Sequence, residues 1–342
     1  MLTPRPLVLS CPLPRSLELI FHPEQAALLR QQYEIVETND EALAALADDV
    51  LERAKYIIGQ PPLSTDTLSR LKSLRCIFNV ESNLIQNMPY DEAFERGIHV
   101  VTTGAVFAQP VAEMAIAMAL NLARGVVDGD VAFRAGGELW GFEGNKSARL
   151  LSGADVGIIG FGDLGKALNR LLAGFRTKTK VFDPWLPKSV LLDQGVMPAS
   201  LDEVLSTSDF VFVVAAVTSE NQQFLNAGSF AKFRNGAAFI LLSRAEVVDF
   251  DALIDAVRSG HIVAASDVYP QEPLAKDHRV RNLPGFLRSA HRAGALTSAF
   301  KMMGEMVLED MELIDKGLPP MRCKRAERET VSRMRSKPVD KS

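Results

Sequence analysis

The chain has 342 residues, of which 47% are apolar and 23% charged, as in an ordinary globular protein. Its formal net charge of −4 gives no indication of a nucleic-acid surface. The unbroken apolar runs, about six to eight residues long, are far shorter than a membrane span. The N-terminus lacks a signal-peptide pattern, and the three cysteines have neither disulfide nor metal-ligand spacing. We therefore expect a cytoplasmic protein of about two domains, without a metal, a membrane or a nucleic-acid partner.

The first part of the chain alternates short apolar runs with helical patterns. The apolar runs lie at 6–11, 33–37, 56–59, 76–81 and 99–103. The helical patterns between them include 23–32, 39–53 and 65–73. Strands that alternate with helices predict βαβ units and a parallel sheet. A long helix is expected next, over 110–124, with Pro110 in its first turn and Gly125 at its end.

A second alternating series begins near residue 155. Its apolar runs lie at 156–160, 180–183, 210–216, 238–243, 262–268 and 286–290. Six such runs in order fit a doubly wound dinucleotide-binding domain. A last helical pattern covers 296–316. The tail, 317–342, has eight Lys or Arg against three Asp or Glu. It indicates a flexible or surface-draped arm, or else an arm that embraces a partner subunit.

The most informative segment is 156–165, which joins an apolar run to a G-x-G-x-x-G turn and then to a helical pattern. Gly160 permits a sharp turn, and Gly162 has no Cβ to keep a pyrophosphate away from the backbone. Gly165 lets the helix and the strand pack closely. The start of the helix points free N–H groups and a positive dipole end at the phosphates. The segment therefore predicts a dinucleotide-binding site.

An acidic residue, Asp183, ends the next apolar run, 18 positions after the last glycine. Its carboxylate would accept hydrogen bonds from the ribose hydroxyls of the cofactor's adenosine. A carboxylate at this place repels the 2′-phosphate of NADP, and Pro184 and Trp185 provide no arginine to hold one. We therefore expect NAD as the cofactor, with Asp163 and Leu164 completing its site at the helix N-terminus.

Three further motifs follow in order. They are Leu241-Leu242-Ser243-Arg244-Ala245-Glu246, then Asp267-Val268-Tyr269-Pro270-Gln271-Glu272-Pro273-Leu274, and Ser289-Ala290-His291-Arg292-Ala293-Gly294. Together with the glycine-rich turn, they resemble the D-isomer-specific 2-hydroxyacid dehydrogenase family over roughly residues 50–316. The resemblance implies an enzyme of class EC 1.1.1.- that transfers a hydride between NAD and a D-2-hydroxy acid or 2-keto acid.

The resemblance also implies roles for four residues. Arg244 would hold the substrate carboxylate and polarise the adjacent carbonyl, which suits its planar guanidinium. His291 would donate the proton in reduction and accept it in oxidation, because a histidine titrates near neutral pH. Glu272 would orient His291 and raise its pKa. Asp267 would contact the nicotinamide carboxamide.

The implied fold is α/β, with two doubly wound lobes. A Rossmann NAD-binding domain, 109–295, would be inserted in a flavodoxin-like substrate domain, 1–108 plus 296–342. The resemblance further implies a homodimer joined through the cofactor domains, with Trp140 near that region.

One segment departs from the family pattern. The loop expected to bind the substrate, Val80-Glu81-Ser82-Asn83, has no glycine, and Glu81 would place a negative charge near an anionic substrate. Ser82 and Asn83 could hydrogen-bond hydroxyl groups instead. The substrate could therefore be an atypical sugar acid or another anion. A third possibility is an NAD(H)-sensing scaffold or corepressor with little turnover.

Overall fold

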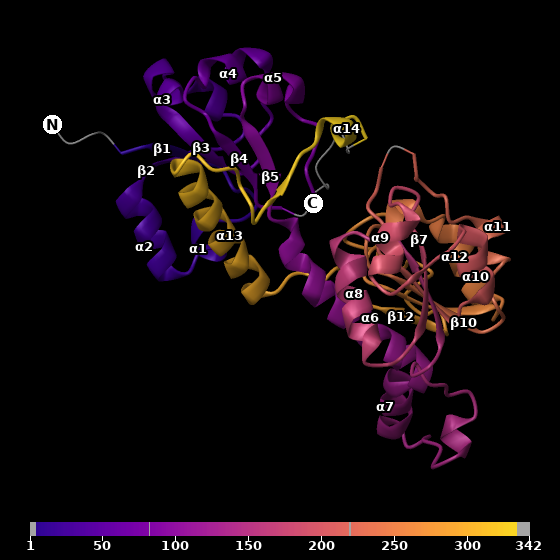
Figure 1. Ribbon diagram of the computed structural model, residues 1–342. Coiled ribbons are helices and arrows are strands. Elements are labelled where there is room, and N and C mark those ends of the chain that lie inside the picture. Colours follow the sequence, from indigo (N-terminus) through magenta and orange to yellow (C-terminus); the bar gives the residue numbers. More distant parts are fainter. Residues whose placement is uncertain (1–4, 82, 219, 334–342) are drawn as a thin grey trace. The chain divides into compact units, whose positions relative to one another are not determined.

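The computed structural model describes residues 5–81, 83–218 and 220–333, which form two compact α/β units (Figure 1). One unit contains the described residues up to Phe107 and those from Ala295 onward. The other unit runs from Ala108 to Gly294. Below, they are called the terminal unit and the central unit.

The described residues of the terminal unit form one six-stranded sheet, in the order β13-β5-β4-β3-β1-β2. Its strands are β1 (Leu7–Ser10), β2 (Glu34–Glu37), β3 (Ala54–Ile58), β4 (Cys76–Asn79), β5 (His99–Thr102) and β13 (Lys324–Arg325). All pairings are parallel except the antiparallel pairing of β13 with β5. The order of the five parallel strands is that of a flavodoxin-like fold.

Helices cover both faces of this sheet, so β1 and β4 are buried along their whole length. One face packs against α1 (Leu17–Ile20), α2 (Pro23–Gln32) and α13 (Thr297–Asp315). The other face packs against α3 (Asp48–Arg53), α4 (Thr65–Arg70), α5 (Tyr90–Glu95) and α14 (Arg328–Val331). Figure 1 shows these two layers on opposite sides of the strands. Two short 3-10 turns, η1 (Leu43–Ala45) and η2 (Gly104–Phe107), complete the unit.

The C-terminal segment is anchored by a buried carboxylate, that of Asp310 on α13. Asp310 accepts hydrogen bonds from the backbone N–H groups of Met321, Arg322 and Cys323, at 2.7–2.9 Å. These bonds lead directly into β13, and Val331 of α14 is buried as well. Residues 321–331 are mostly exposed but fixed to the unit by these contacts, so they fit the surface-draped alternative rather than a flexible arm. Residues 334–342 lie outside the described part of the chain.

The described residues of the central unit form a seven-stranded parallel sheet, in the order β12-β11-β10-β9-β6-β7-β8. Its strands are β6 (Asp155–Ile159), β7 (Lys178–Phe182), β8 (Met197–Pro198), β9 (Phe210–Val213), β10 (Ala237–Leu241), β11 (Ile262–Ser266) and β12 (Phe286–Arg288). The chain runs outward from β6 in one direction through β8, and then outward in the other direction from β9. This reversal is the topological switch point of a doubly wound fold, at which ligands bind beyond the carboxyl ends of the strands.

Helices also cover both faces of the second sheet. The face against α10 (Leu201–Thr207), α11 (Ala227–Phe230) and α12 (Phe250–Arg258) holds a large aromatic and aliphatic core. On the other face lie α6 (Ala108–Arg124), which contacts β10 and β11, and α8 (Asp163–Ala173), which contacts α6. The remaining elements are α7 (Val126–Arg134), α9 (Lys188–Asp193), η3 (Glu143–Asn145) and η4 (Ala245–Val247).

One stretch, Gly104–Arg124, is long and apolar enough to cross a membrane by length and composition alone, with a mean hydropathy of 1.4. This stretch contains no long unbroken apolar run, because Gln109, Pro110 and Glu113 interrupt it. These three residues lower its mean hydropathy only slightly. Within the central unit, α6 packs against the sheet and α8, which is the environment of a core helix.

Candidate active site

Three of the predicted site residues lie just beyond the carboxyl ends of three neighbouring parallel strands of the central unit. Arg244 follows β10, Asp267 follows β11, and His291 follows β12. Because β10, β11 and β12 pair in parallel, their carboxyl ends lie side by side. The structure therefore brings these residues together, although they are up to 47 positions apart in the sequence (291 − 244).

His291 and Glu272 form a direct contact. The Nδ1 of His291 lies 2.6 Å from Oε2 of Glu272, and the other carboxylate oxygen accepts the Tyr269 N–H at 2.8 Å. Burial by itself raises the pKa of the Glu272 carboxyl, but the hydrogen bonds from His291 and Tyr269 outweigh it, and the net pKa is lowered. Glu272 is therefore a charged acceptor that fixes the orientation of the imidazole ring.

The backbone of His291 adopts a left-handed conformation, with φ = 51°, which is uncommon outside glycine. Asp267 holds this turn. Its carbonyl oxygen accepts the His291 N–H at 2.7 Å, and its two carboxylate oxygens accept the N–H groups of Arg292 and Ala293, each at 2.9 Å. The Asp267 residue is only 1% exposed, so these bonds satisfy a buried charge. Its predicted contact with the nicotinamide stays a prediction.

Arg244 has an extended backbone just before η4. Its Nη1 donates to the carbonyl oxygen of Ser243 at 2.7 Å, which fixes the half-buried guanidinium near the strand end. Its charge is close enough to Glu272 to contribute to the lowered pKa of that carboxyl. A fixed guanidinium of this kind can bind a carboxylate with two parallel hydrogen bonds.

The glycine-rich turn has the geometry that a dinucleotide requires. Gly160 has φ = +89°, and a Cβ there would lie 2.5 Å from the Cα of Ala215. A Cβ on Gly165 would lie 2.5 Å from the carbonyl oxygen of Gly160. At Gly162, by contrast, a Cβ would meet no atom of the described residues within 4 Å. Two of the glycines are thus needed for packing, and the third leaves open space at the N-terminus of α8, where a pyrophosphate fits.

Asp183 joins this turn to the end of β7. Its Oδ2 accepts the Phe161 N–H at 2.7 Å, and its Oδ1 accepts the Trp185 N–H at 3.0 Å. Each carboxylate oxygen can accept more than one hydrogen bond, so a ribose hydroxyl can still bind. Asp163 and Leu164 are the first two residues of α8.

The predicted substrate loop lies in the terminal unit, beyond the carboxyl end of β4. Asn79, at the end of that strand, is 1% exposed. Its side chain accepts the Glu81 N–H at 2.9 Å and donates to the carbonyl oxygen of Asn83 at 3.2 Å. Val80 is buried, Glu81 is half-buried and Asn83 is exposed, whereas Ser82 lies outside the described residues. Side-chain hydrogen bonds therefore shape a loop that has no glycine.

No sequence motif points to Asn79, nor to Arg15, which donates to the carbonyl oxygen of Val80 at 2.7 Å. An asparagine at the end of an apolar strand, such as Asn79, is a weak sign of a structural role: a buried amide needs hydrogen-bond partners, but the sequence does not show which ones. Arg15 gave no local signal, since its partner is 65 residues away.

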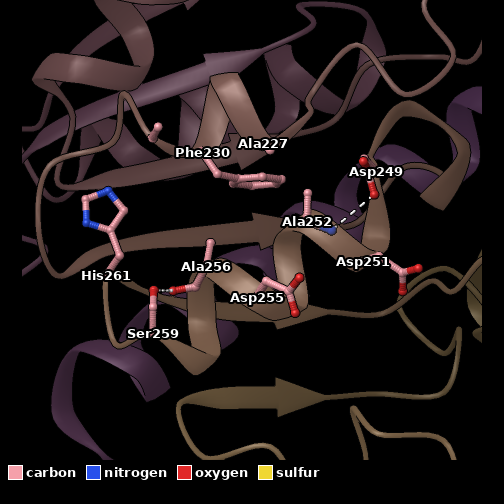
Figure 2. Close-up of a pocket in the computed structure, with 10 residues that line it drawn as sticks. Ala227, Phe230, Asp249, Asp251, Ala252, Asp255, Ala256, Ser259 and His261 are labelled. Atoms are coloured by element: carbon pink, nitrogen blue, oxygen red, sulfur yellow. Dashed lines mark hydrogen bonds between the residues drawn. The ribbon is translucent and has the colours of Figure 1, made fainter.

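A cavity of about 700 Å³ lies elsewhere in the central unit, between α11 and α12 (Figure 2). Its lining includes Phe230, Asp251, Asp255 and His261. His261 precedes β11, at the amino ends of the strands, and the cavity contains none of the predicted site residues. The predicted site residues therefore lie away from this cavity, at the carboxyl edge of the sheet.

Comparison with known proteins identifies the family to which the chain belongs. The sequence model of the D-isomer specific 2-hydroxyacid dehydrogenase NAD binding domain matches residues 116–293. A glyoxylate reductase of Korarchaeum cryptofilum is 30% identical over 239 residues, which are 68% of this chain and 71% of the relative. A glyoxylate reductase of Pyrococcus furiosus is 28% identical over 311 residues, 86% of this chain and 90% of the relative.

Among solved structures, a phosphoglycerate oxidoreductase from Rhizobium etli is 68% identical, with a TM-score of 0.89. The match covers 96% of this chain and all of that protein. The predicted two-lobed α/β fold is confirmed by this likeness and by the two sheets. The chain belongs to the D-isomer specific 2-hydroxyacid dehydrogenase family and is an NAD(P)-dependent oxidoreductase that interconverts 2-hydroxy acids and 2-keto acids.

Proposed function

We propose that the protein is an NAD-dependent reductase of a small 2-keto acid, with Arg244, Glu272 and His291 as its catalytic residues. The observation that carries the proposal is the 2.6 Å contact between His291 and Glu272, in the same unit as Arg244 and the glycine-rich turn. The central unit is then the NAD-binding domain, and the terminal unit is the substrate domain. Their predicted boundaries, 109–295 and 1–108 plus 296–342, are part of this proposal.

Reduction of a ketone requires a polarised carbonyl and a proton for its oxygen. The bound nicotinamide supplies the hydride. Glu272 engages Nδ1 of His291, so Nε2 is the nitrogen that gives the proton to the substrate oxygen, and that recovers it in the reverse reaction. Arg244 binds the substrate carboxylate and stabilises the charge that develops on the neighbouring oxygen.

The preference for NAD rests on Asp183. Its carboxylate lies between the glycine-rich turn and the end of β7, where it can bind ribose hydroxyls and repels a 2′-phosphate. Asp163, Leu164 and the open space at Gly162 hold the pyrophosphate, and Asp267 contributes to the nicotinamide end of the same site.

The substrate class is suggested by relatives. Proteins that align with much of the chain are named glyoxylate reductase, hydroxypyruvate reductase and D-3-phosphoglycerate dehydrogenase. We propose a 2-keto acid of this size, bound by Arg244 and by the loop that contains Val80, Glu81 and Asn83. The buried thiols of all three cysteines suit a reducing cytoplasm.

We also propose a homodimer joined through the central units. In the described part of the chain, α7 buries none of its side chains. Large apolar side chains are exposed on α7 and on the segment after it: Val126, Val127, Val131, Phe133, Leu139, Trp140, Phe142 and Leu150. Trp140 and Phe142 are 74% and 78% exposed. An apolar surface of this extent is typical of an interface between subunits.

The first prediction concerns the proton donor. The His291→Asn variant should reduce 2-keto acids about 10²–10⁴-fold more slowly, because an amide cannot transfer the proton. Its dissociation constant for NADH should be unchanged. The measurement is NADH oxidation against a panel from glyoxylate and hydroxypyruvate to sugar-derived keto acids. His278→Asn, elsewhere in the central unit, is the control. Near-normal turnover by His291→Asn would contradict the assignment. If the wild-type protein binds NADH but reduces no acid of the panel, a sensing role is favoured.

The second prediction concerns cofactor choice. Asp183→Ala removes the carboxylate that repels a 2′-phosphate, so NADH should bind more weakly and its advantage over NADPH should narrow. Fluorescence titration with NADH and with NADPH measures the ratio of the two dissociation constants. Asp193→Ala, an exposed change on α9, is the control. A ratio that does not move would refute the role of Asp183.

The third prediction separates ligand binding from packing in the glycine-rich turn. Gly162→Ala should leave thermal stability nearly unchanged, since its Cβ enters open space, but should weaken NADH binding at least about tenfold. Gly174→Ala, at the other end of α8, is the matched control. Equal NADH affinity in both variants would show that the open space at Gly162 is not a cofactor site.

The fourth prediction concerns assembly. Phe142→Asp places a charge in the proposed interface and should shift the protein from dimer to monomer in analytical ultracentrifugation. Leu192→Asp makes the same kind of change, from an exposed apolar side chain to a charged one, on α9 outside the proposed interface. It should leave the dimer intact. A monomeric wild-type protein would exclude the proposal.

A further inference from the structure

A cavity of about 420 Å³ in the terminal unit is lined mainly by cationic side chains. Its basic lining residues are Arg53, Lys55, Lys72, Arg75 and Arg96. The other residues that line it are Pro6, Ser73 and Leu74. Among the described residues, neither a carboxylate nor an aromatic ring contributes to this lining. The cavity therefore favours an anion but offers no ring on which a nucleotide base could stack.

The cavity lies at the amino ends of the strands. Pro6 precedes β1, Lys55 is the second residue of β3, and Arg75 precedes β4. The predicted substrate loop follows the carboxyl end of β4, at the opposite end of the same sheet. All the residues that line the cavity belong to the terminal unit. It is therefore separate from the predicted substrate loop and from the site residues of the central unit.

Two of the cations are held in place by the protein. Arg96 donates to the carbonyl oxygens of Leu68 and Leu71, at 2.5 and 2.6 Å. These carbonyls lie at the C-terminal end of α4, where the helix dipole favours a cation. Lys55 Nζ lies 2.5 Å from Oδ1 of Asp315. The Arg96 and Lys55 side chains are each 27% exposed, so they give the wall of the cavity fixed and partly desolvated positive charge.

Two further cations are more exposed to solvent. Arg53 forms an ion pair with Glu34, and Lys72 forms one with Glu52. Exposed ion pairs of this kind contribute little to stability. Either side chain can therefore turn toward a bound anion without a large loss of folding free energy.

Arg75 is the cation that these contacts do not explain. Its backbone is fixed, because its N–H donates to the carbonyl oxygen of Lys55 and its own carbonyl oxygen accepts the His99 N–H, each at 2.9 Å. Its guanidinium has no acceptor within the described part of the chain. Burial lowers the pKa of His99, and the charges of Arg325 and Arg75 lower it further, which indicates a positive potential at this edge. A guanidinium in this position can bind an oxyanion with two parallel hydrogen bonds.

We propose that this cavity is a binding site for a compact polyanion, whose charge is carried by phosphate or carboxylate oxygens. Arg75 makes the principal contact with the ligand. Arg96 and Lys55 supply the fixed positive charge of the wall, and the exposed Arg53 and Lys72 turn toward the ligand when it binds. The inference goes beyond the proposed function, in which no residue of this cavity takes part.

The test is isothermal titration with pyrophosphate and, separately, with citrate. The protein is saturated with NADH, so that the glycine-rich turn is occupied. Arg75→Gln should weaken the binding of at least one anion about tenfold or more, because hydrogen bonds from a charged group are lost. Arg75→Lys keeps the charge and should weaken that binding less. A loss for pyrophosphate identifies a phosphate ligand, and a loss for citrate identifies a carboxylate ligand.

Arg322→Gln is the matched control, because it removes the same charge from an exposed arginine of the same unit, outside the cavity. It should bind both anions as wild type does. Equal losses in Arg75→Gln and Arg322→Gln would show that the anions respond only to net charge. Unchanged binding in Arg75→Gln would place the anions elsewhere on the protein. Either result, or the failure of both anions to bind wild type, overturns the inference.

Thermal unfolding provides a second measurement. Without an anion, Arg75→Gln should unfold at the wild-type temperature, because the Arg75 side chain is exposed. The anion that binds should raise the unfolding temperature of wild type and of Arg322→Gln more than that of Arg75→Gln. An equal rise in all three proteins would contradict the proposed site. Neither measurement requires turnover of a keto acid, so failure of the proposed function would leave this test unaffected.

Discussion

The reactive geometry of the central unit depends on one buried carboxylate, that of Asp267. Burying an ionised carboxylate is unfavourable unless it accepts strong hydrogen bonds. Asp267 obtains them from two consecutive N–H groups just after His291. In return it holds His291 in a left-handed conformation that costs about 1–2 kcal/mol for a residue with a Cβ. The side chain that contacts Glu272 is thus carried by a backbone turn that Asp267 stabilises.

The strands of the two sheets are the part of the fold that the sequence predicts well. Apolar runs of four or more residues between helical patterns indicate strands wherever both sheet faces are covered, as in β9 and β10. Parallel pairing then places the ends of neighbouring strands together, so residues after three successive runs can be predicted to meet. Parallel pairing explains why Arg244 and His291 lie at the same edge of the sheet, whereas the pairing of His291 with Glu272 is implied only by the family resemblance.

The sequence does not predict the short strands, and β13 depends on contacts with residues far away in the sequence. The strands β8 and β13 have two residues each, too few for any periodic pattern. β13 exists because Asp310, on another element, binds the N–H groups that precede it. The tail around it is basic and poor in apolar residues, a composition that indicates an arm. A single buried carboxylate overrides that composition, and only tertiary structure reveals it.

The predicted substrate loop shows how a departure from a family pattern can be tolerated. A glycine in such a loop allows the backbone to turn and to present its N–H groups to an anion. Here Asn79 binds the backbone on both sides of the turn, and Gln60 in turn holds Asn79 through a 2.7 Å hydrogen bond. The conformation is thus specified by side chains from two strand ends instead of by glycine.

Such a loop is also free to vary in charge. All 2-keto acids share the carboxylate and the reacting carbonyl, so the residues proposed to bind them, Arg244 and His291, are constrained by the reaction itself. The rest of the substrate differs from one acid to another, and the residues that meet it can change without altering hydride or proton transfer. Glu81 is a departure of this kind, because the reaction itself does not require a negative charge at that position. Departures from the family pattern in this loop should therefore affect substrate specificity rather than hydride or proton transfer.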